Sequence, residues 1–202
     1  MRFLLAVSVL CFGAQAGTVA YAAEIAWHAK RPLTWEDFQG PVPSGIDDKR
    51  VAATAASISW SYSYEIGWSS DECAFAIATL QSAASFSPEK SWVRSGHRTT
   101  AILEHEQIHF DIAQIYTEMF SSATRELVGT SRPCEGRNER RATRYVEREI
   151  ARLVGSVYED VWRQFQNRQE MYDSETRHGI DARAQARWTS EITAQLKAAG
   201  NR

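Results

Sequence analysis

The sequence predicts an α+β protein in which a small antiparallel sheet is followed by a mostly helical half. Two patterns predict this class: apolar and polar side chains alternate over residues 57–66, and apolar side chains recur every three or four residues over residues 99–127. The 202 residues are 44% hydrophobic and 24% charged, which is typical of a globular chain with its own core. A net charge of −2 gives no general attraction to nucleic acid, which we exclude as a partner.

The N-terminus has the pattern of a secretory signal peptide. Arg2 supplies a positive start, an apolar stretch follows, and Ala20 and Ala22 are small residues suitably placed before a cleavage point. We therefore expect a signal peptide over residues 1–22 and a single mature domain over residues 23–202. No apolar run after the signal is long enough to span a membrane. The expected location is outside the cytosol, either periplasmic or secreted.

The expected sheet begins with a strand over residues 57–66. One face of this strand consists of Ile58, Trp60, Tyr62, Tyr64 and Ile66. Residues 67–72 are expected to form a turn, and residues 73–82 are rich enough in β-forming side chains to be the returning strand. The two strands are expected to pair as a hairpin.

Three helices are expected in the second half of the chain. The first covers residues 99–127 and ends before Gly129, a typical helix stop. Asn138 is a candidate N-cap for a second long helix, whose apolar pattern continues to Phe165. The third is expected to begin at Asp181, after a break at Gly179. Its buried face is expected to consist of Ala184, Trp188, Ile192 and Leu196.

The first helix carries the motif His105-Glu106-Gln107-Ile108-His109. Residues four apart lie one turn apart on the same helix face, so the two imidazoles can share one metal ion. The glutamate beside the first histidine can then act as general base toward a water molecule at the metal. The motif therefore predicts a Zn²⁺ site with His105 and His109 as ligands and Glu106 as the base.

A catalytic zinc site needs a third protein ligand, and residues 172–179 are dense in candidates. We expect this segment to follow the second helix. His178 is the favoured ligand, because it is the only histidine after the motif and precedes a glycine at which the chain can turn back. Glu175 is the alternative, and Asp173 and Asp111 remain open. Asp111 points away from the histidine face and is better placed to hold a neighbouring loop.

The cysteines indicate a disulfide. Cys11 lies in the expected signal peptide, which leaves Cys73 and Cys134 as an even pair in an exported chain. We expect them to be bonded, closing a loop of about sixty residues that is worth about 4 kcal/mol in the chain-entropy model.

The start of the expected second helix is rich in arginine. Arg137, Arg140, Arg141 and Arg144 are most simply a solvated helix face with local ion pairs to nearby glutamates. The alternative interpretation is a surface for an anionic polymer of the cell wall.

Four motifs occur in order along the mature chain: PLTWEDFQGPVP at residues 32–43, SWV at 91–93, HEQIHFDIA at 105–113, and YDSETRHG at 172–179, followed by Gln185 and Trp188. This combination resembles the DUF922 family, which is described as predicted secreted zinc-dependent proteases. The resemblance extends from about Trp27 to Trp188. It implies a peptidase in a bacterial envelope and a histidine-glycine pair at His178, but it implies no particular substrate.

These features together predict a secreted or periplasmic zinc metallopeptidase with a zincin-like fold. Zn²⁺ would be held by His105, His109 and His178. Glu106 would activate water, and Tyr172 would either stabilise the oxyanion or simply pack. The expected substrate is a peptide or protein, with proteins of the cell envelope among the candidates, and the edge of the hairpin could hold its backbone by strand addition. The alternative function is a zinc-stabilised binding module of the cell envelope that does not turn over a substrate. The oligomeric state is not predicted.

Overall fold

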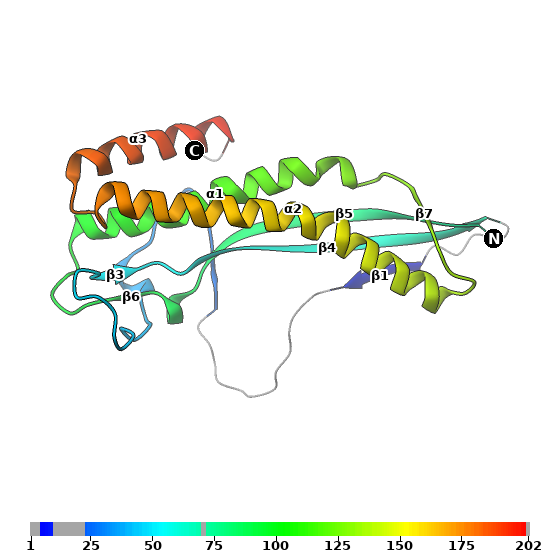
Figure 1. Ribbon diagram of the computed structural model, residues 1–202, viewed down its shortest axis with the longest axis horizontal. Coiled ribbons are helices and arrows are strands. Elements are labelled where there is room, and N and C mark those ends of the chain that lie inside the picture. The colour runs from blue at the N-terminus through cyan, green and yellow to red at the C-terminus, as the bar shows by residue number, and fades with distance from the viewer. Residues whose placement is uncertain (1–4, 10–22, 70–71, 201–202) are drawn as a thin grey trace. The chain divides into compact units, whose positions relative to one another are not determined.

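Figure 1 shows the computed structural model of the chain, which describes residues 5–9, 23–69 and 72–200. The structure is mixed α/β with a small antiparallel sheet and three helices, as predicted. Within the described residues, the strands are β1 (Leu5–Val9), β2 (Ile25–Ala26), β3 (Ala52–Ala53), β4 (Ala56–Ser69), β5 (Glu72–Phe86), β6 (Trp92–Val93) and β7 (Arg132–Cys134). The α-helices are α1 (Thr100–Thr124), α2 (Glu139–Thr176) and α3 (Ala182–Ala198).

The chain divides into two compact units. The first, here called the disulfide unit, comprises Met1–Ala16, Trp60–Ser82 and Met119–Trp162. The second, here called the site unit, comprises Gly17–Ser59, Ala83–Glu118 and Arg163–Arg202. Strands β4 and β5 and helices α1 and α2 each contribute residues to both units.

The main sheet has the strand order β1-β4-β5-β2, and β7 also pairs with β5. The predicted alternation is confirmed along β4, where Ile58, Tyr64 and Ile66 are buried while Ser59 and Glu65 are exposed. The hairpin is longer than predicted. The strands continue through most of the expected turn, to Ser69 and from Glu72. The returning strand also extends to Phe86, because β2 pairs with its last residues.

A cluster of aromatic rings packs in the disulfide unit. Trp60 stacks on Tyr62 with ring centroids 5.7 Å apart, and it also contacts Phe120 from α1 and Tyr158 from α2. Phe120 and Tyr158 meet edge to face at 5.9 Å. Such pairs contribute about 0.5–1.5 kcal/mol each beyond the burial of their surface. The apolar face predicted for the first strand therefore packs on both long helices.

The predicted disulfide between Cys73 and Cys134 is present. The two residues face each other across β5 and β7, with their Cα atoms 5.1 Å apart. The bond therefore ties the segment after α1 to the hairpin.

Replacing both cysteines by serine is expected to lower the free energy of unfolding by about 2–4 kcal/mol, because the unfolded chain regains the entropy of an open loop. Urea denaturation with and without reductant measures this difference. Reductant should destabilise the wild type and leave the double variant unchanged. Equal stability of the wild type and the double variant in the absence of reductant would contradict the prediction.

Helices α2 and α3 start where the sequence predicts. Asn138 accepts the N–H of Arg141 at 3.1 Å at the start of α2, and Asp181 accepts the N–H of Ala184 at 2.9 Å at the start of α3. The predicted buried face of α3 is confirmed in full: Ala184, Trp188, Ile192 and Leu196. Gly129, at φ 74°, follows the last turn after α1. Among the described residues, no helix is both long and apolar enough to cross a membrane.

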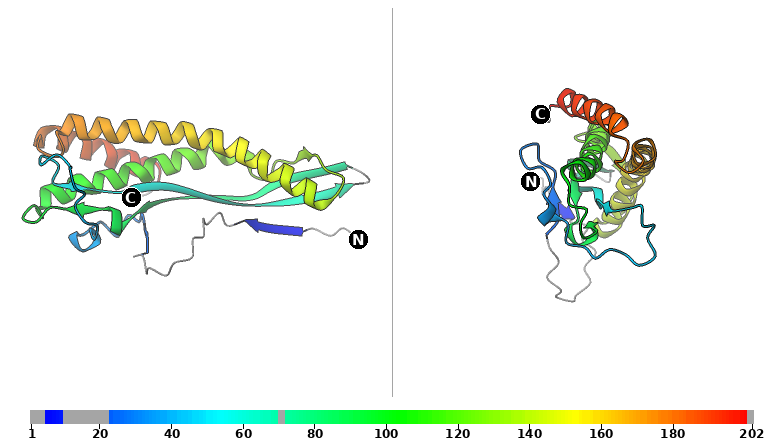
Figure 2. Two further views of the ribbon diagram at one scale, coloured as in Figure 1. Left: turned by 60° about the horizontal axis from the view of Figure 1, so that its bottom comes forward. Right: turned by 90° about the vertical axis from the view of Figure 1, so that its left-hand side faces the viewer.

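One helix boundary was predicted wrongly. The second helix does not end before residues 172–179 but continues through Thr176. Tyr172 and Thr176 are fully buried there, and the Thr176 hydroxyl donates to the Tyr172 carbonyl at 2.7 Å. Burial in the site unit therefore extends the helix through a stretch of poor helix formers. α3 then begins after a short turn and runs beside the C-terminal part of α2 (Figure 2).

The expected signal peptide lies largely outside the described residues. The exception is β1, which pairs antiparallel with β4 from Ile66 to Tyr62.

Candidate metal centre

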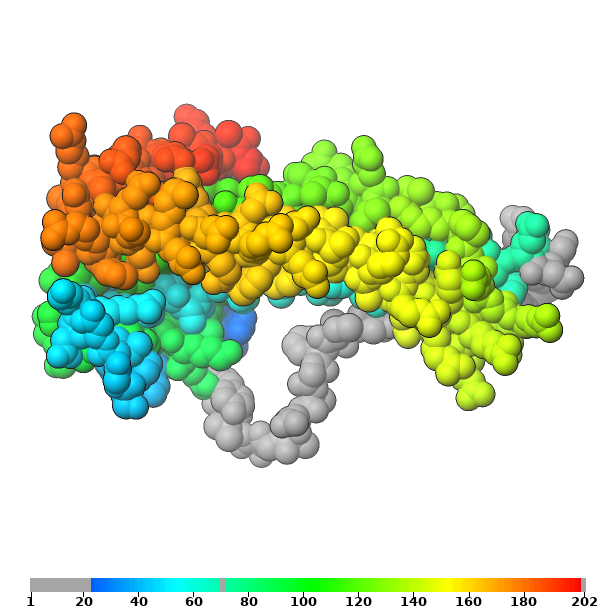
Figure 3. All heavy atoms as spheres, in the orientation of Figure 1, coloured from blue at the N-terminus to red at the C-terminus, as the bar shows by residue number. Residues whose placement is uncertain are grey.

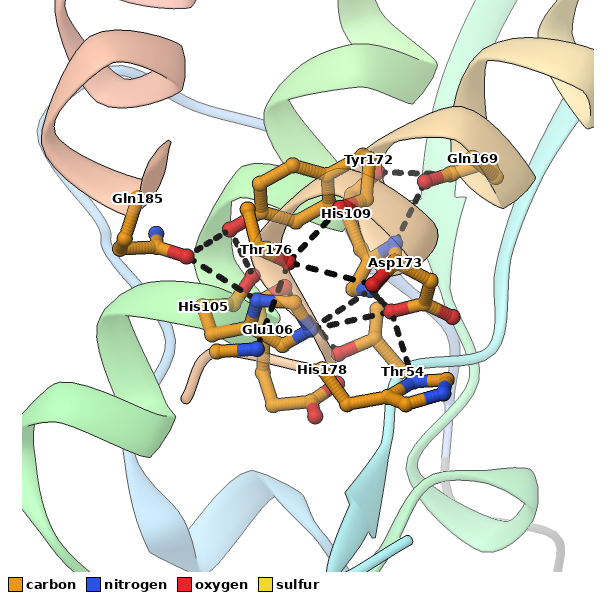
Figure 4. A network of polar contacts seen from close by, with 11 residues as sticks. Thr54, His105, Glu106, His109, Gln169, Tyr172, Asp173, Thr176, His178 and Gln185 are labelled. Carbon is orange, nitrogen blue, oxygen red and sulfur yellow. Dashed lines mark hydrogen bonds and ion pairs between the residues drawn. The ribbon is translucent and has the colours of Figure 1, made fainter. Parts of the chain in front are cut away.

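The two motif histidines lie one turn apart on α1 and face inward in the site unit (Figure 4). His105 is 3% exposed and His109 is 9% exposed. Their Nε2 atoms are 3.2 Å apart, and their rings are almost perpendicular. The helical spacing therefore brings two imidazole nitrogens to one point, as the motif predicted.

Asp173 from the last turn of α2 completes this cluster. Its Oδ1 atom lies 3.1 Å from Nε2 of His105 and 3.1 Å from Nε2 of His109. Among the described residues, these three form the group of side chains that could hold a metal ion. Burial raises the pKa of the Asp173 carboxyl, but the imidazoles of His105 and His109, which donate to it when they are protonated, outweigh burial and hold that pKa well below its ordinary value. The carboxylate is therefore ionised, as a metal ligand must be.

Two glutamines orient the histidines from behind. Gln185 on α3 places its Oε1 atom 3.1 Å from Nδ1 of His105, and Gln169 on α2 places its Oε1 atom 2.5 Å from Nδ1 of His109. An amide oxygen can only accept, so each Nδ1 carries the proton and each Nε2 of the neutral ring keeps a free lone pair. Gln169 is itself fixed by donating to the His109 carbonyl at 2.9 Å.

This arrangement calls for a cation. Two Nε2 lone pairs and one carboxylate oxygen face one another at 3.1–3.2 Å, where they repel unless a proton or a metal ion lies among them. The pKa of His109 shows the same tendency. Burial lowers this pKa, but the negative charges of Asp173 and Glu106 raise it by more than burial lowers it. The pKa of His109 therefore lies above its ordinary value. The cluster is therefore built to hold positive charge.

Glu106 lies beside the cluster on α1 and is 3% exposed. Its Oε2 atom is buried and has no hydrogen-bond partner in the described part of the chain. Its backbone carbonyl accepts the hydroxyl of Thr54 at 3.1 Å, which fixes this turn of α1 to the segment next to β3. A buried carboxylate oxygen without a partner is costly, and it is free to accept a proton from a bound molecule.

A cavity of about 370 Å³ opens over these residues. One wall is the extended segment of residues 50–56, and the opposite wall comes from α2. His105, Glu106, His109, Asp173 and His178 all line it. The candidate metal ligands and the candidate base therefore share one cleft within the site unit.

His178 lies at the edge of the cleft, and its side chain is 47% exposed. Its Nδ1 atom is 3.3 Å from the Asp173 oxygen that faces the two motif histidines. His178 thus contacts the carboxylate rather than belonging to the compact group of three. Arg177 and His178 both have left-handed backbones, at φ 55° and 56°, which costs free energy for residues other than glycine.

The glycine after His178 packs directly on the candidate metal centre. Gly179 has φ 82°, and a Cβ atom added to it would lie 3.1 Å from Cγ of His105. Only glycine accommodates both the backbone and this close approach. The histidine-glycine pair therefore holds the turn after α2 against the first motif histidine.

The other predicted candidates lie elsewhere. Glu175 faces α3, where it accepts from Arg187 at 2.8 Å and from Nε1 of Trp188 at 2.9 Å. Asp111 is buried on the far side of the motif and accepts from Nε1 of Trp27 at 2.8 Å. The prediction that Asp111 holds a neighbouring loop is confirmed. Gln107, inside the motif, holds the same N-terminal segment by accepting the N–H of Leu33 at 2.7 Å.

Tyr172 is fully buried behind the histidines. Its ring stacks on His105 with centroids 4.6 Å apart, and its hydroxyl donates to Gln185 at 2.8 Å. Burial raises the pKa of this hydroxyl above its ordinary value, so it stays protonated. These contacts correspond to the packing role, which was one of the two roles expected for Tyr172. The hydroxyl is hydrogen-bonded outside the cleft.

Sequence reasoning did not identify Gln169, Thr54 or the wall formed by residues 50–56. Gln185 was noted only as part of a motif. A regular spacing in the sequence could have identified Gln169. The inward face of α2 continues at intervals of three and four residues through Phe165, Gln169, Tyr172 and Thr176.

The comparisons with known proteins agree with the motifs. No curated protein and no solved structure matches the chain. One family model does match, over residues 35–179, and is described as "Bacterial protein of unknown function (DUF922)". The matched region contains the motif histidines, Glu106, Asp173 and the histidine-glycine turn, and it covers most of the chain. The chain belongs to the DUF922 family.

Proposed function

We propose that this protein is an exported zinc-dependent peptidase with a zincin-like fold. The observation that carries the proposal is the convergence of His105, His109 and Asp173 on one point, with Glu106 beside them in the same cleft. An HExxH helix packed against a small antiparallel sheet supports the fold assignment. The signal-like N-terminus and the disulfide support export.

The three residues fit zinc. Two imidazole nitrogens and one carboxylate oxygen are a donor set that zinc takes in catalytic sites, with a fourth position left for water or substrate. Ligand atoms about 2.0–2.1 Å from a tetrahedral ion lie about 3.3 Å apart. The observed separations are 3.1, 3.1 and 3.2 Å. The cluster is therefore already close to the size that the ion requires.

The chain's own residues supply the acid–base chemistry of peptide hydrolysis. Bound zinc would polarise the substrate carbonyl and lower the pKa of a water molecule. As water attacks the carbonyl carbon, the unpartnered Oε2 of Glu106 accepts its proton. Glu106 then returns the proton to the amine nitrogen as the C–N bond breaks, so the carboxylate is regenerated. Tyr172 and the two glutamines hold the imidazoles in place throughout.

The wall of the cleft suits an extended peptide. β3 pairs with β6, and the N–H of Arg94 donates to the Val51 carbonyl at 2.7 Å. Because hydrogen-bonded and non-bonded pairs alternate in antiparallel strands, the N–H and C=O groups of Ala52 point away from β6. These groups belong to the segment that lines the cleft, and they can pair with a substrate backbone. The proposed strand addition therefore takes place at β3 and not at the edge of the hairpin.

Removing the metal tests the proposal. The purified protein is expected to cleave a mixed peptide library, to lose that activity after treatment with a zinc chelator, and to regain it when zinc is restored. Mass spectrometry of the products reports the cleavage. A protein that binds one zinc per chain and cleaves nothing under any of these conditions would be the binding module instead.

Replacing Gln185 by leucine is expected to weaken zinc binding by about 10–100-fold, because His105 then loses the acceptor that fixes its tautomer and ring orientation. Competition with a chromogenic chelator measures the affinity. The matched control is Gln195→Leu on the same helix, whose amide donates only to Glu191 at 3.1 Å. An equal effect of the two substitutions would show that Gln185 does not support the metal.

A further inference from the structure

The disulfide unit contains a second cavity, of about 380 Å³, here called the arginine cavity. It is lined by Glu135, Gly136, Arg141, Arg144, Tyr145 and Arg148. The cavity lies at the start of α2, which is coloured yellow-green in Figure 3. Nothing in the proposed peptidase chemistry uses it.

The arginines of this region are in excess over the acids that could neutralise them. Residues 131–152 contain seven arginines, four glutamates and no lysine, although the whole chain has a net charge of −2. Two of the four glutamates contact partners other than the arginines of the cavity. Glu149 pairs with Arg152 at 2.6 Å, and Glu147 accepts the hydroxyl of Tyr64 at 3.4 Å. In the described structure, Arg141, Arg144 and Arg148 form no ion pair. The local ion pairs expected from the sequence therefore do not neutralise this surface.

The wall of the cavity is rigid. Glu135 follows Cys134, which is fixed to β5 by the disulfide. Gly136, at φ 147°, passes so close to α2 that an added Cβ atom would lie 2.5 Å from the backbone nitrogen of Ala142. The Asn138 cap then fixes the start of the helix. The three arginines are thus carried by a preformed backbone, so a ligand has to order their side chains but not the wall itself.

We propose that the arginine cavity binds a phosphate-bearing sugar. The guanidinium fork matches the oxygens of a phosphate bidentately, and three such groups line this one cavity. The cavity is open to solvent, and its volume of about 380 Å³ suits a small ligand. Tyr145 adds an aromatic ring beside the guanidinium groups, and the Arg148 guanidinium lies 6.0 Å from its centroid. The site is independent of the metal centre and of the proposed peptidase activity.

Calorimetric titration of the full chain with glucose 6-phosphate tests the proposal, with glucose and inorganic phosphate titrated in parallel. We expect saturable binding of glucose 6-phosphate, weaker binding of inorganic phosphate and none of glucose. Arg144→Ala is expected to lower the affinity about tenfold or more, because one charge-assisted contact is lost. The matched control is Arg140→Ala, an exposed arginine one turn away that does not line the cavity.

Several outcomes would overturn the proposal. Equal loss of affinity in the Arg140 and Arg144 variants would mean a diffuse charge effect and no site. Binding to vesicles of an anionic phospholipid, without binding of glucose 6-phosphate, would assign the surface to a membrane instead. An absence of saturable binding by the wild type would also refute it. Circular dichroism of both variants ensures that a lost signal does not reflect unfolding.

Discussion

Glu106→Gln is expected to retain zinc and the folded structure while its hydrolytic rate falls about 100- to 10,000-fold, which is the usual contribution of a general base. The amide has the size of the carboxyl group but cannot accept the proton of the attacking water. Glu106 is not part of the group His105, His109 and Asp173, so its replacement leaves the ligand atoms in place. Steady-state cleavage of a peptide found in the library screen measures the rate, and elemental analysis measures the metal.

The matched control is Glu104→Gln. Glu104 is exposed on the same helix, two residues away, and does not line the cleft. Its amide variant is expected to cleave at the wild-type rate. A Glu106 variant that keeps substantial activity would mean that another group activates the water. A Glu106 variant that loses zinc would mean that this carboxylate is a ligand.

The sequence predicted the motif helix well because its signal is local. The spacing of His105 and His109 is set by helix geometry alone, so their convergence requires no knowledge of the rest of the fold. The disulfide was equally predictable, because Cys11 lies in the expected signal peptide and the two remaining cysteines allow only one pairing. The strand pattern of β4 is also local, but its length depends on partners that a single-strand pattern does not report.

The position of Asp173 depends on tertiary packing, which explains why it was only a minor candidate. Three of the four residues after Tyr172, namely aspartate, serine and threonine, have low helix propensity, so the stretch resembles a loop. Burial of Tyr172 and Thr176 overrides that preference and continues α2 by one more turn. The turn aims Asp173 at the histidines and Glu175 at α3. If the segment is taken as a loop, as the sequence suggests, the direction of each side chain is unknown and the third ligand cannot be chosen.

Asp173→Ala is expected to abolish tight zinc binding, with a loss of affinity well above the roughly 100-fold that removal of a supporting residue costs. The reason is geometric: Oδ1 of Asp173 is the one described carboxylate oxygen that lies 3.1 Å from both Nε2 atoms. His178→Ala removes only a contact to that carboxylate at 3.3 Å, so we expect a loss of about 10–100-fold at unchanged stoichiometry. Glu175→Ala leaves the group untouched and is expected to bind zinc like the wild type.

Competition with a chelator measures the zinc affinity of the three variants and so ranks the contributions of the three residues. The visible spectrum of the cobalt-substituted proteins distinguishes a metal ligand from a residue that only holds a ligand in place. Loss of a ligand changes the coordination and therefore the spectrum, whereas loss of a supporting contact weakens binding and leaves the spectrum of the loaded protein intact. Wild-type affinity in Asp173→Ala, together with loss of metal in His178→Ala, would make His178 the third ligand. In that case the left-handed turn at Arg177 and His178 would have to rearrange on metal binding, because His178 now contacts Asp173 from the edge of the cleft.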